Sequence, residues 1–155
     1  MTDTVPMPGA ADSCPCTSGE RFGRCCAPVL ADAVAATTAL ALMRSRYTAF
    51  VLGDEVHLRS SWDPQTCPVD IHPLEQRHWL GLAIKDCVAG TAEDETGIVE
   101  FVARYKIAGK AQRLQERSRF RKVQGCWCYV DGEVARDAKA ASRSSVRSSR
   151  RKERR

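Results

Sequence analysis

The sequence predicts an α+β fold in which helices pack on one face of a curved antiparallel sheet. Two observations carry this prediction. Apolar residues repeat at helical spacing in the first half of the chain and at every second position in the second half. The 155 residues, 43% of them hydrophobic and 28% charged, suffice for one domain with its own core.

A long helix is expected over residues 33–52. Four apolar side chains fall on one stripe of this segment: Leu40, Met43, Tyr47 and Phe50. Gly53 is a typical helix-ending residue, and Asp54 is a good cap for a second, short helix. Leu58 and Trp62 lie four apart and would share one face of that helix.

Four strands are expected after the helices, over residues 79–88, 97–107, 110–123 and 126–130. The pair Gln124-Gly125 predicts a tight hairpin turn between the last two. Alternation assigns the following apolar residues to inward faces: Leu80, Leu82 and Ile84 in the first strand, and Val99, Phe101, Ala103, Tyr105 and Ile107 in the second.

Four clustered cysteines near the amino end predict a metal site: Cys14, Cys16, Cys25 and Cys26. Four thiolates in a tetrahedron are a common set of zinc ligands, and one 13-residue loop can supply them. Gly19 and Gly23 would ease the tight loop, Phe22 would cover the metal, and Arg21 and Arg24 would offset part of the thiolate charge. A disulfide between adjacent Cys25 and Cys26 would be strained, which disfavours the oxidised alternative. Such a closed site is structural rather than catalytic.

The net charge of +5 belongs to one end of the chain. Residues 136–155 hold nine Lys or Arg and two acids, a charge of +7, which leaves −2 for residues 1–135. This segment reads as a disordered basic tail, either a solubilising terminus or a binding arm for RNA or ribosomes. Residues 1–12 read as a disordered lead. No apolar run reaches the roughly 20 residues of a membrane span and no secretory signal is recognisable, so a cytoplasmic protein is expected.

Two groups of charged residues on the third strand are candidate sites. Its outward face carries arginines that form either a solvated surface or an anion- or RNA-binding surface: Arg113, Arg117, Arg119 and Arg121. Glu116 points the other way, where it either forms a structural ion pair with Arg46 or Arg104 or serves as a pocket acid. The residues of a possible pocket are Arg46, Tyr47, Trp62, Trp79, Arg104, Glu116 and Phe120.

The remaining cysteines, Cys67, Cys87, Cys126 and Cys128, are expected to be small apolar residues, with a second metal site as the alternative. His57, His72 and His78 form no ligand pattern and are expected at the surface or at caps.

The segment Cys14-Pro15-Cys16-Thr17-Ser18-Gly19 with the later Cys25-Cys26 pair resembles the SEC-C motif, which in the preprotein translocase motor binds a chaperone and the ribosome. The body resembles the bacterial YchJ-like family, whose activity is unassigned, through these stretches: Leu42 to Phe50, Trp79 to Leu82, Val99 to Tyr105, Glu116 to Phe120 and Trp127 to Gly132. The resemblance implies a SEC-C-like knuckle over 13–30, an NTF2-like cone over 33–135 and a possible homodimer.

Three functions follow as hypotheses. The first is a zinc-binding adaptor whose knuckle docks on a protein or ribosomal partner. The second is an NTF2-like domain that binds or converts a small molecule in a pocket around Glu116. The third is RNA binding through the arginine face and tail. The chain has no Gly-rich phosphate loop, no G-x-S-x-G and no serine-triad pattern, which favours a binding protein over an enzyme.

Overall fold

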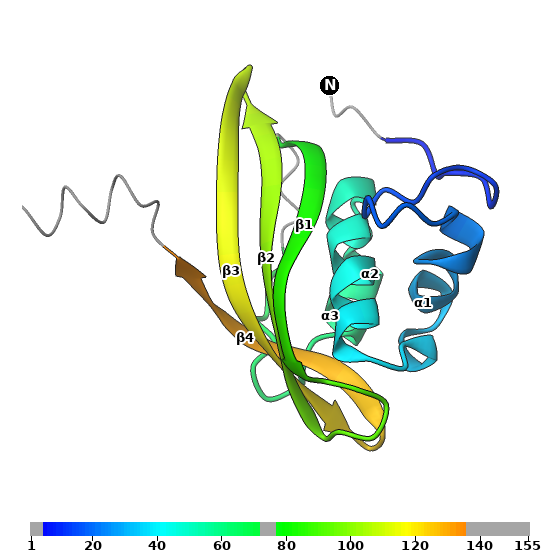
Figure 1. The fold of residues 1–155 in the computed structure, drawn as a ribbon, viewed down its shortest axis with the longest axis vertical. Helices are drawn as coiled ribbons and strands as arrows, with labels where there is room; N and C mark the ends of the chain where they lie inside the picture. The colour runs from blue at the N-terminus through cyan, green and yellow to red at the C-terminus, as the bar shows by residue number, and fades with distance from the viewer. Residues whose placement is uncertain (1–4, 72–76, 136–155) are drawn as a thin grey trace, which may run out of the picture.

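The computed structural model describes residues 5–71 and 77–135, so the expected basic tail and His72 lie outside the described residues. The helical elements are η1 (Phe22–Arg24), α1 (Ala27–Ala31), η2 (Ala33–Ala35), α2 (Ala39–Leu52) and α3 (Glu55–Ser60). The strands are β1 (His78–Ala89), β2 (Thr96–Ile107), β3 (Lys110–Val123) and β4 (Cys126–Ala135). The α+β prediction is confirmed, and Figure 1 shows α2 between the curved sheet and α1.

Local capping chemistry sets the helix boundaries. Thr38 Oγ1 accepts a hydrogen bond from the N–H of Ala41 at 3.0 Å and starts α2, so the predicted 33–52 helix is divided into η2 and α2. Gly53 ends α2 in the left-handed conformation, with φ of 72°. Asp54 Oδ1 accepts from the N–H of His57 at 3.0 Å and caps α3, as predicted.

The strands form an antiparallel meander in the order β1-β2-β3-β4. Gln124 and Gly125 both have positive φ, 52° and 78°, and close the β3–β4 hairpin as predicted. β4 extends beyond the expected end at Val130, because its later residues continue to pair with β3 as far as Ala135.

Two residues predicted to face inward, Leu80 and Ile107, are exposed instead. A register shift between Trp79 and Gly81 interrupts the alternation at the start of β1. Leu80 is therefore 45% exposed, while Trp79 and Leu82 pack against the core. The far end of β2 also leaves the core, since Ile107 is 36% exposed.

One contiguous apolar core joins the sheet, α2 and the cysteine segment. Its buried members include Leu42, Met43, Val99, Phe101, Phe120 and Trp127, together with Cys16, Phe22 and Cys26. The helix α2 is buried on nearly every side, and even Ser45, Arg46 and Thr48 are at most 3% exposed. None of the described helices is long and apolar enough to cross a membrane.

Candidate metal centre and ligand cavity

The predicted cysteine ligands converge in space. The Sγ atoms of Cys14, Cys16, Cys25 and Cys26 all lie within 4.8 Å of one another. The loop is folded back by the N–H of Cys14, which donates to the carbonyl of Glu20 at 2.9 Å. Three of the four cysteines are buried, and Cys25 is partly buried.

The segment before the knuckle is part of the site. The N–H of Phe22 donates to the carbonyl of Asp12 at 2.8 Å, and the N–H of Gly23 donates to that of Ala10 at 3.0 Å. Residues 9–12, expected within a disordered lead, are therefore held against the knuckle. On the other side, Thr17 Oγ1 accepts from the N–H of Leu82 in β1 at 3.1 Å.

Two residues of α2 contact the cysteine cluster. The hydroxyl of Thr48 donates to Cys26 Sγ at 3.3 Å, and Arg44 Nη1 lies 3.8 Å from Cys16 Sγ. Arg21 and Arg24, expected to offset the thiolate charge, are exposed. Among the described residues, Arg44 hydrogen-bonds to the sulfur of Cys16. Arg44 and Thr48 were not predicted from the sequence, although their i, i+4 spacing puts them on one helix face.

The donor set fits a tetrahedral metal ion. Sulfurs about 2.3 Å from such an ion lie about 3.8 Å from one another, and the Cys16–Cys25 and Cys25–Cys26 Sγ pairs lie 3.5 and 4.0 Å apart. Hydrogen bonds donated by neighbouring thiols lower the pKa of Cys16, whereas the hydrogen bonds that Cys26 itself donates to Cys14 and Cys16 raise the pKa of Cys26. Burial raises the pKa of Cys25 to about 11. Four thiolates can therefore coexist here only around a cation.

A cavity of about 250 Å³ lies between α2 and the inner face of the sheet. Five predicted pocket residues line it: Arg46, Tyr47, Trp62, Trp79 and Glu116. Two others do not. Arg104 is exposed because β2 points alternate residues away from the core, and Phe120 is buried against the ring of Tyr129, 5.7 Å between centroids. The lining residues that the sequence analysis missed are Met43, Phe50, Arg77, Phe101, Ala103, Leu114 and Tyr129.

Arg46 is the buried cation of this cavity, with 3% of its surface exposed. Its Nη1 donates to the carbonyl of Leu58 at 2.8 Å and to Ser61 Oγ at 2.7 Å. The guanidinium carbon lies 4.7 Å from the ring centroid of Trp62 and 4.4 Å from that of Tyr129. Burial lowers the pKa of Arg46 to about 10, which leaves it charged at neutral pH.

Glu116 lines the same cavity without pairing with Arg46. Its Oε2 accepts from Ser118 Oγ at 2.5 Å and from the hydroxyl of Tyr129 at 3.4 Å. A side chain at Gly132 would place its Cβ 2.6 Å from Glu116 Cδ, so the glycine makes room for this carboxylate. The expected ion pair of Glu116 with Arg46 or Arg104 is not formed among the described residues.

Comparisons with known proteins agree with this architecture. A family model described as "YchJ, middle NTF2-like domain" matches residues 38–132. This chain belongs to the YchJ family. A UPF0225 protein of Chromobacterium violaceum is 48% identical over 130 residues, which cover 81% of this chain and 96% of that protein. A UPF0225 protein of Ralstonia nicotianae is 45% identical over 147 residues, covering 86% and 99%.

Two solved structures share the fold of this YchJ-family chain. The solution structure of a SEC-C motif containing protein from Rhodopseudomonas palustris has 34% identity and a TM-score of 0.72, and the match covers 81% of this chain and all of that one. The crystal structure of a SEC-C motif containing protein from Psychrobacter arcticus, at 24% identity, has a TM-score of 0.66 and covers 83% and 86%. At 24% identity, the similarity to the Psychrobacter arcticus protein shows a shared fold and nothing more.

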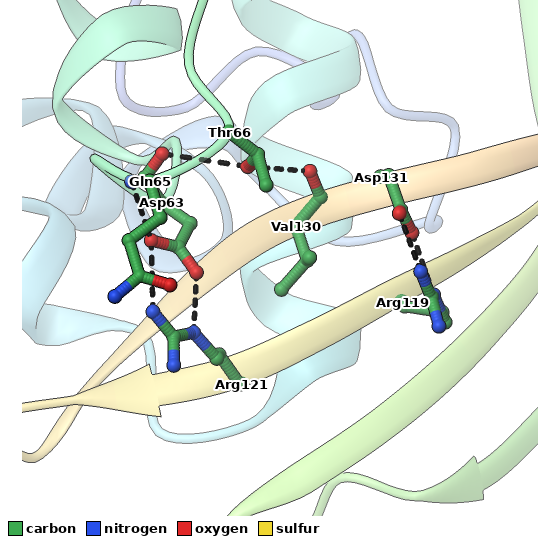
Figure 2. Close-up of polar contacts among 7 residues, drawn as sticks. All are labelled: Asp63, Gln65, Thr66, Arg119, Arg121, Val130 and Asp131. Carbon is green, nitrogen blue, oxygen red and sulfur yellow. Dashed lines mark hydrogen bonds and ion pairs between the residues drawn. The ribbon is translucent and has the colours of Figure 1, made fainter.

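In this YchJ-family chain the outward arginines are mostly paired with carboxylates. Figure 2 shows Arg121 bound to Asp63 by both carboxylate oxygens, and Arg119 bound to Asp131, with 2.5 Å between Nη2 and Oδ2. Arg117 contacts Glu100 at 3.0 Å and Asp86 at 3.2 Å. Of the four predicted anion-surface residues, only Arg113 has no ion pair among the described residues. Most of the positive charge on this face is therefore neutralised.

The other candidate ligands do not assemble. Within residues 5–71 and 77–135, the four knuckle cysteines are the only cluster suited to a metal. Cys128 is buried, as expected of a small apolar residue, whereas Cys87 is exposed. His57, expected at the surface or at a cap, is 2% exposed. Its backbone N–H donates to the capping Asp54, and its Nε2 lies 2.8 Å from Ser45 Oγ.

Proposed function

We propose that this protein binds a small organic molecule in the cavity between α2 and the sheet, and that its cysteine centre is a structural zinc site that fixes α2. The observation that carries the proposal is Arg46, a buried cation that lines the cavity without a carboxylate partner among the described residues. Buried charges are ordinarily paired, so an unpaired one beside an open space supports a ligand site.

The walls of the cavity also suit a ligand. Aromatic rings dominate the lining, and a few polar groups converge among them, namely Arg46, Tyr47 and Glu116. This combination of an apolar enclosure with few oriented polar groups is typical of small-molecule sites. At about 250 Å³, the space is below the range of drug-sized pockets and suits a compact ligand.

Zinc is the proposed ion because all four ligands are thiols and the site has no position open for substrate. Its role would be to hold the knuckle against α2 and β1, through Thr48 and Thr17. Elemental analysis of protein prepared under reductant and without chelator should give one zinc per chain. A different metal would correct the identity, and markedly less than one equivalent of any metal would contradict the site.

The test of the binding function uses the zinc-loaded full chain. Native mass spectrometry of protein taken directly from cells, and a thermal-shift screen of small metabolites, should reveal compounds that bind at one per chain. Filling the cavity with Ala103→Leu should abolish that binding, whereas the same enlargement at exposed Ala111 should not. Binding unaffected by Ala103→Leu would place the ligand elsewhere and contradict the proposal.

Docking of the knuckle on a ribosomal or protein partner is a second proposal. The cysteines face inward, and the knuckle presents Gly19, Glu20, Arg21 and Arg24 to solvent. Co-sedimentation with ribosomes should be weakened by Arg21→Glu with Arg24→Glu, charge reversals that leave the thiols intact. Removal of residues 136–155 serves as the comparison, since loss of binding only on that deletion would assign it to the basic tail.

A further inference from the structure

The cavity contains hydrogen-bond donors that its own residues do not satisfy. Among the described residues, the indole Nε1 atoms of Trp62 and Trp79 are buried without an acceptor, and both rings line the cavity. Arg46 donates its hydrogen bonds to the described residues through Nη1, which leaves Nε and Nη2 available. Buried donors are nearly always paired in folded proteins, so this excess indicates a ligand rich in acceptors.

The charges around the cavity indicate an anion. Arg46 and Arg77 both line it, and Glu116 is the one carboxylate among the described lining residues. The Arg77 guanidinium carbon lies 4.3 Å from the ring centroid of Tyr105, which places the positive charge against an aromatic face. The described part of the lining thus carries one positive charge in excess. Glu116 would repel a second anionic group, so a ligand with a single negative charge is favoured.

The walls indicate a flat ligand. The ring of Trp79 lies edge-on to Tyr47, with 5.5 Å between centroids, and 6.0 Å from Phe50. The rings of Trp62 and Tyr129, which both contact Arg46, lie 5.1 Å apart. Aromatic side chains at these spacings offer faces and edges on which another ring can pack.

We infer that the ligand is a small planar monocarboxylate, of the size of an aromatic acid. Its carboxylate is bound by the guanidinium of Arg46 and by indole N–H donors, and its ring packs among the aromatic walls. The inference rests on the proposed small-molecule function and specifies its ligand class. A charged, planar guanidinium matches a carboxylate in shape and charge, whereas a neutral amide of the same size lacks the charge.

The test compares benzoate with benzamide, which has the same ring but no charge. Both are titrated into the zinc-loaded full chain by calorimetry and by tryptophan fluorescence. Benzoate is expected to bind at least 10-fold more tightly than benzamide at pH 7. Trp62→Phe and Trp79→Phe keep a ring and remove one donor each, and each should weaken benzoate binding by 3-fold or more. Trp127→Phe is the matched control, because Trp127 Nε1 donates to the carbonyl of Thr37 outside the cavity lining.

Arg46→Lys keeps the charge and loses the flat, forked donor, and should weaken benzoate binding by 10-fold or more. Because Arg46 also holds Leu58 and Ser61, that variant requires a check of folding by circular dichroism, and the two tryptophan variants keep the test valid if it fails to fold. Equal affinities for benzoate and benzamide, or unchanged benzoate affinity in both tryptophan variants, would overturn the ligand class while leaving the small-molecule function standing. Absence of any ligand in the broader screen would overturn both.

Discussion

The hydroxyl of Thr48 donates a hydrogen bond to the Sγ of Cys26 over 3.3 Å, and both side chains are buried. This contact joins the middle of the central helix directly to a metal-ligand sulfur. The knuckle is therefore part of the domain core rather than an appendage on a linker, and Phe22 shares that core with Leu42. A change at the cysteine centre should therefore lower the stability of the whole domain.

Thr48→Val tests the contact between α2 and the centre. Valine keeps the shape and removes the hydroxyl. The variant therefore loses a hydrogen bond that contributes about 1 kcal/mol to the free energy of unfolding. Metal affinity should fall by roughly 10-fold, as is usual when a group supporting a ligand is removed. Competition with a chromogenic chelator and urea unfolding would measure the two effects. Thr96→Val, at an exposed strand start, should change neither.

Loss of the metal should destabilise the whole domain. Cys16→Ser removes a fully buried ligand, and chelation should have the same effect on the natural chain. A loss of about 3 kcal/mol would lower the melting temperature by roughly 10 °C for a domain of this size. Calorimetry with and without chelator measures it. Cys87→Ser is the control, since Cys87 is exposed and lies outside the cluster; if chelation left the melting temperature unchanged, the centre would have no structural role.

The two arginine pairs in Figure 2 should differ in their effect on stability. Asp63 is 1% exposed, and Arg121→Met would leave its buried carboxylate without a cation, at a cost of about 3 kcal/mol. Arg119 and Asp131 are 64% and 47% exposed, so Arg119→Met should cost under about 1 kcal/mol. Chemical denaturation of both variants gives the comparison, and equal costs would refute this account of the loop after α3.

His57 should make the fold sensitive to mild acid. Burial, aided by the charge of Arg46, lowers the pKa of His57 from 6.5 to about 4, while Asp54 acts in the opposite direction. The unfolded chain takes up the proton first, so stability is full above pH 6.5 and declines as the pH falls toward 4. The loss by pH 4 is on the order of 3 kcal/mol. Urea unfolding at a series of pH values measures the slope.

The control for that prediction is His57→Gln. The hydroxyl of Ser45 donates to the carbonyl of Leu42 at 2.7 Å, so the imidazole donates from Nε2 to Ser45 Oγ. Glutamine can supply the same N–H and does not titrate. The variant should show a flatter stability profile between pH 6.5 and 4, and a slope equal to that of the natural chain would assign the pH dependence to other groups.

The features that follow from local chemistry were predictable from the sequence. Asp54 caps its helix and Gln124-Gly125 makes its turn because neighbouring backbone alone determines both. The four knuckle cysteines were also predictable, since their spacing within 13 residues constrains them to meet. Glu116 was assigned to the inner face by strict alternation along β3, and it lines the cavity.

The errors concern relationships between distant segments. Leu80 turned outward because the pairing of β1 with β2 shifts register, which no pattern within β1 reveals. The burial of His57 depends on Ser45, twelve residues earlier on another helix. Arg44 was overlooked for the same reason, because its partner Cys16 lies 28 residues away. In each case, a contact with a segment distant in the sequence determined where the side chain lies.

Arg46, Tyr47 and Thr48 are consecutive on α2, yet the first two line the cavity and the third contacts the cysteine centre. A movement of this helical turn would therefore displace groups at both places. For the ion and the small molecule proposed above, thermodynamic reciprocity requires that the ion changes the affinity for the small molecule by the same factor as the small molecule changes the affinity for the ion. If the proposed ion strengthens that binding, cells starved of the metal should contain protein with less of the small molecule bound.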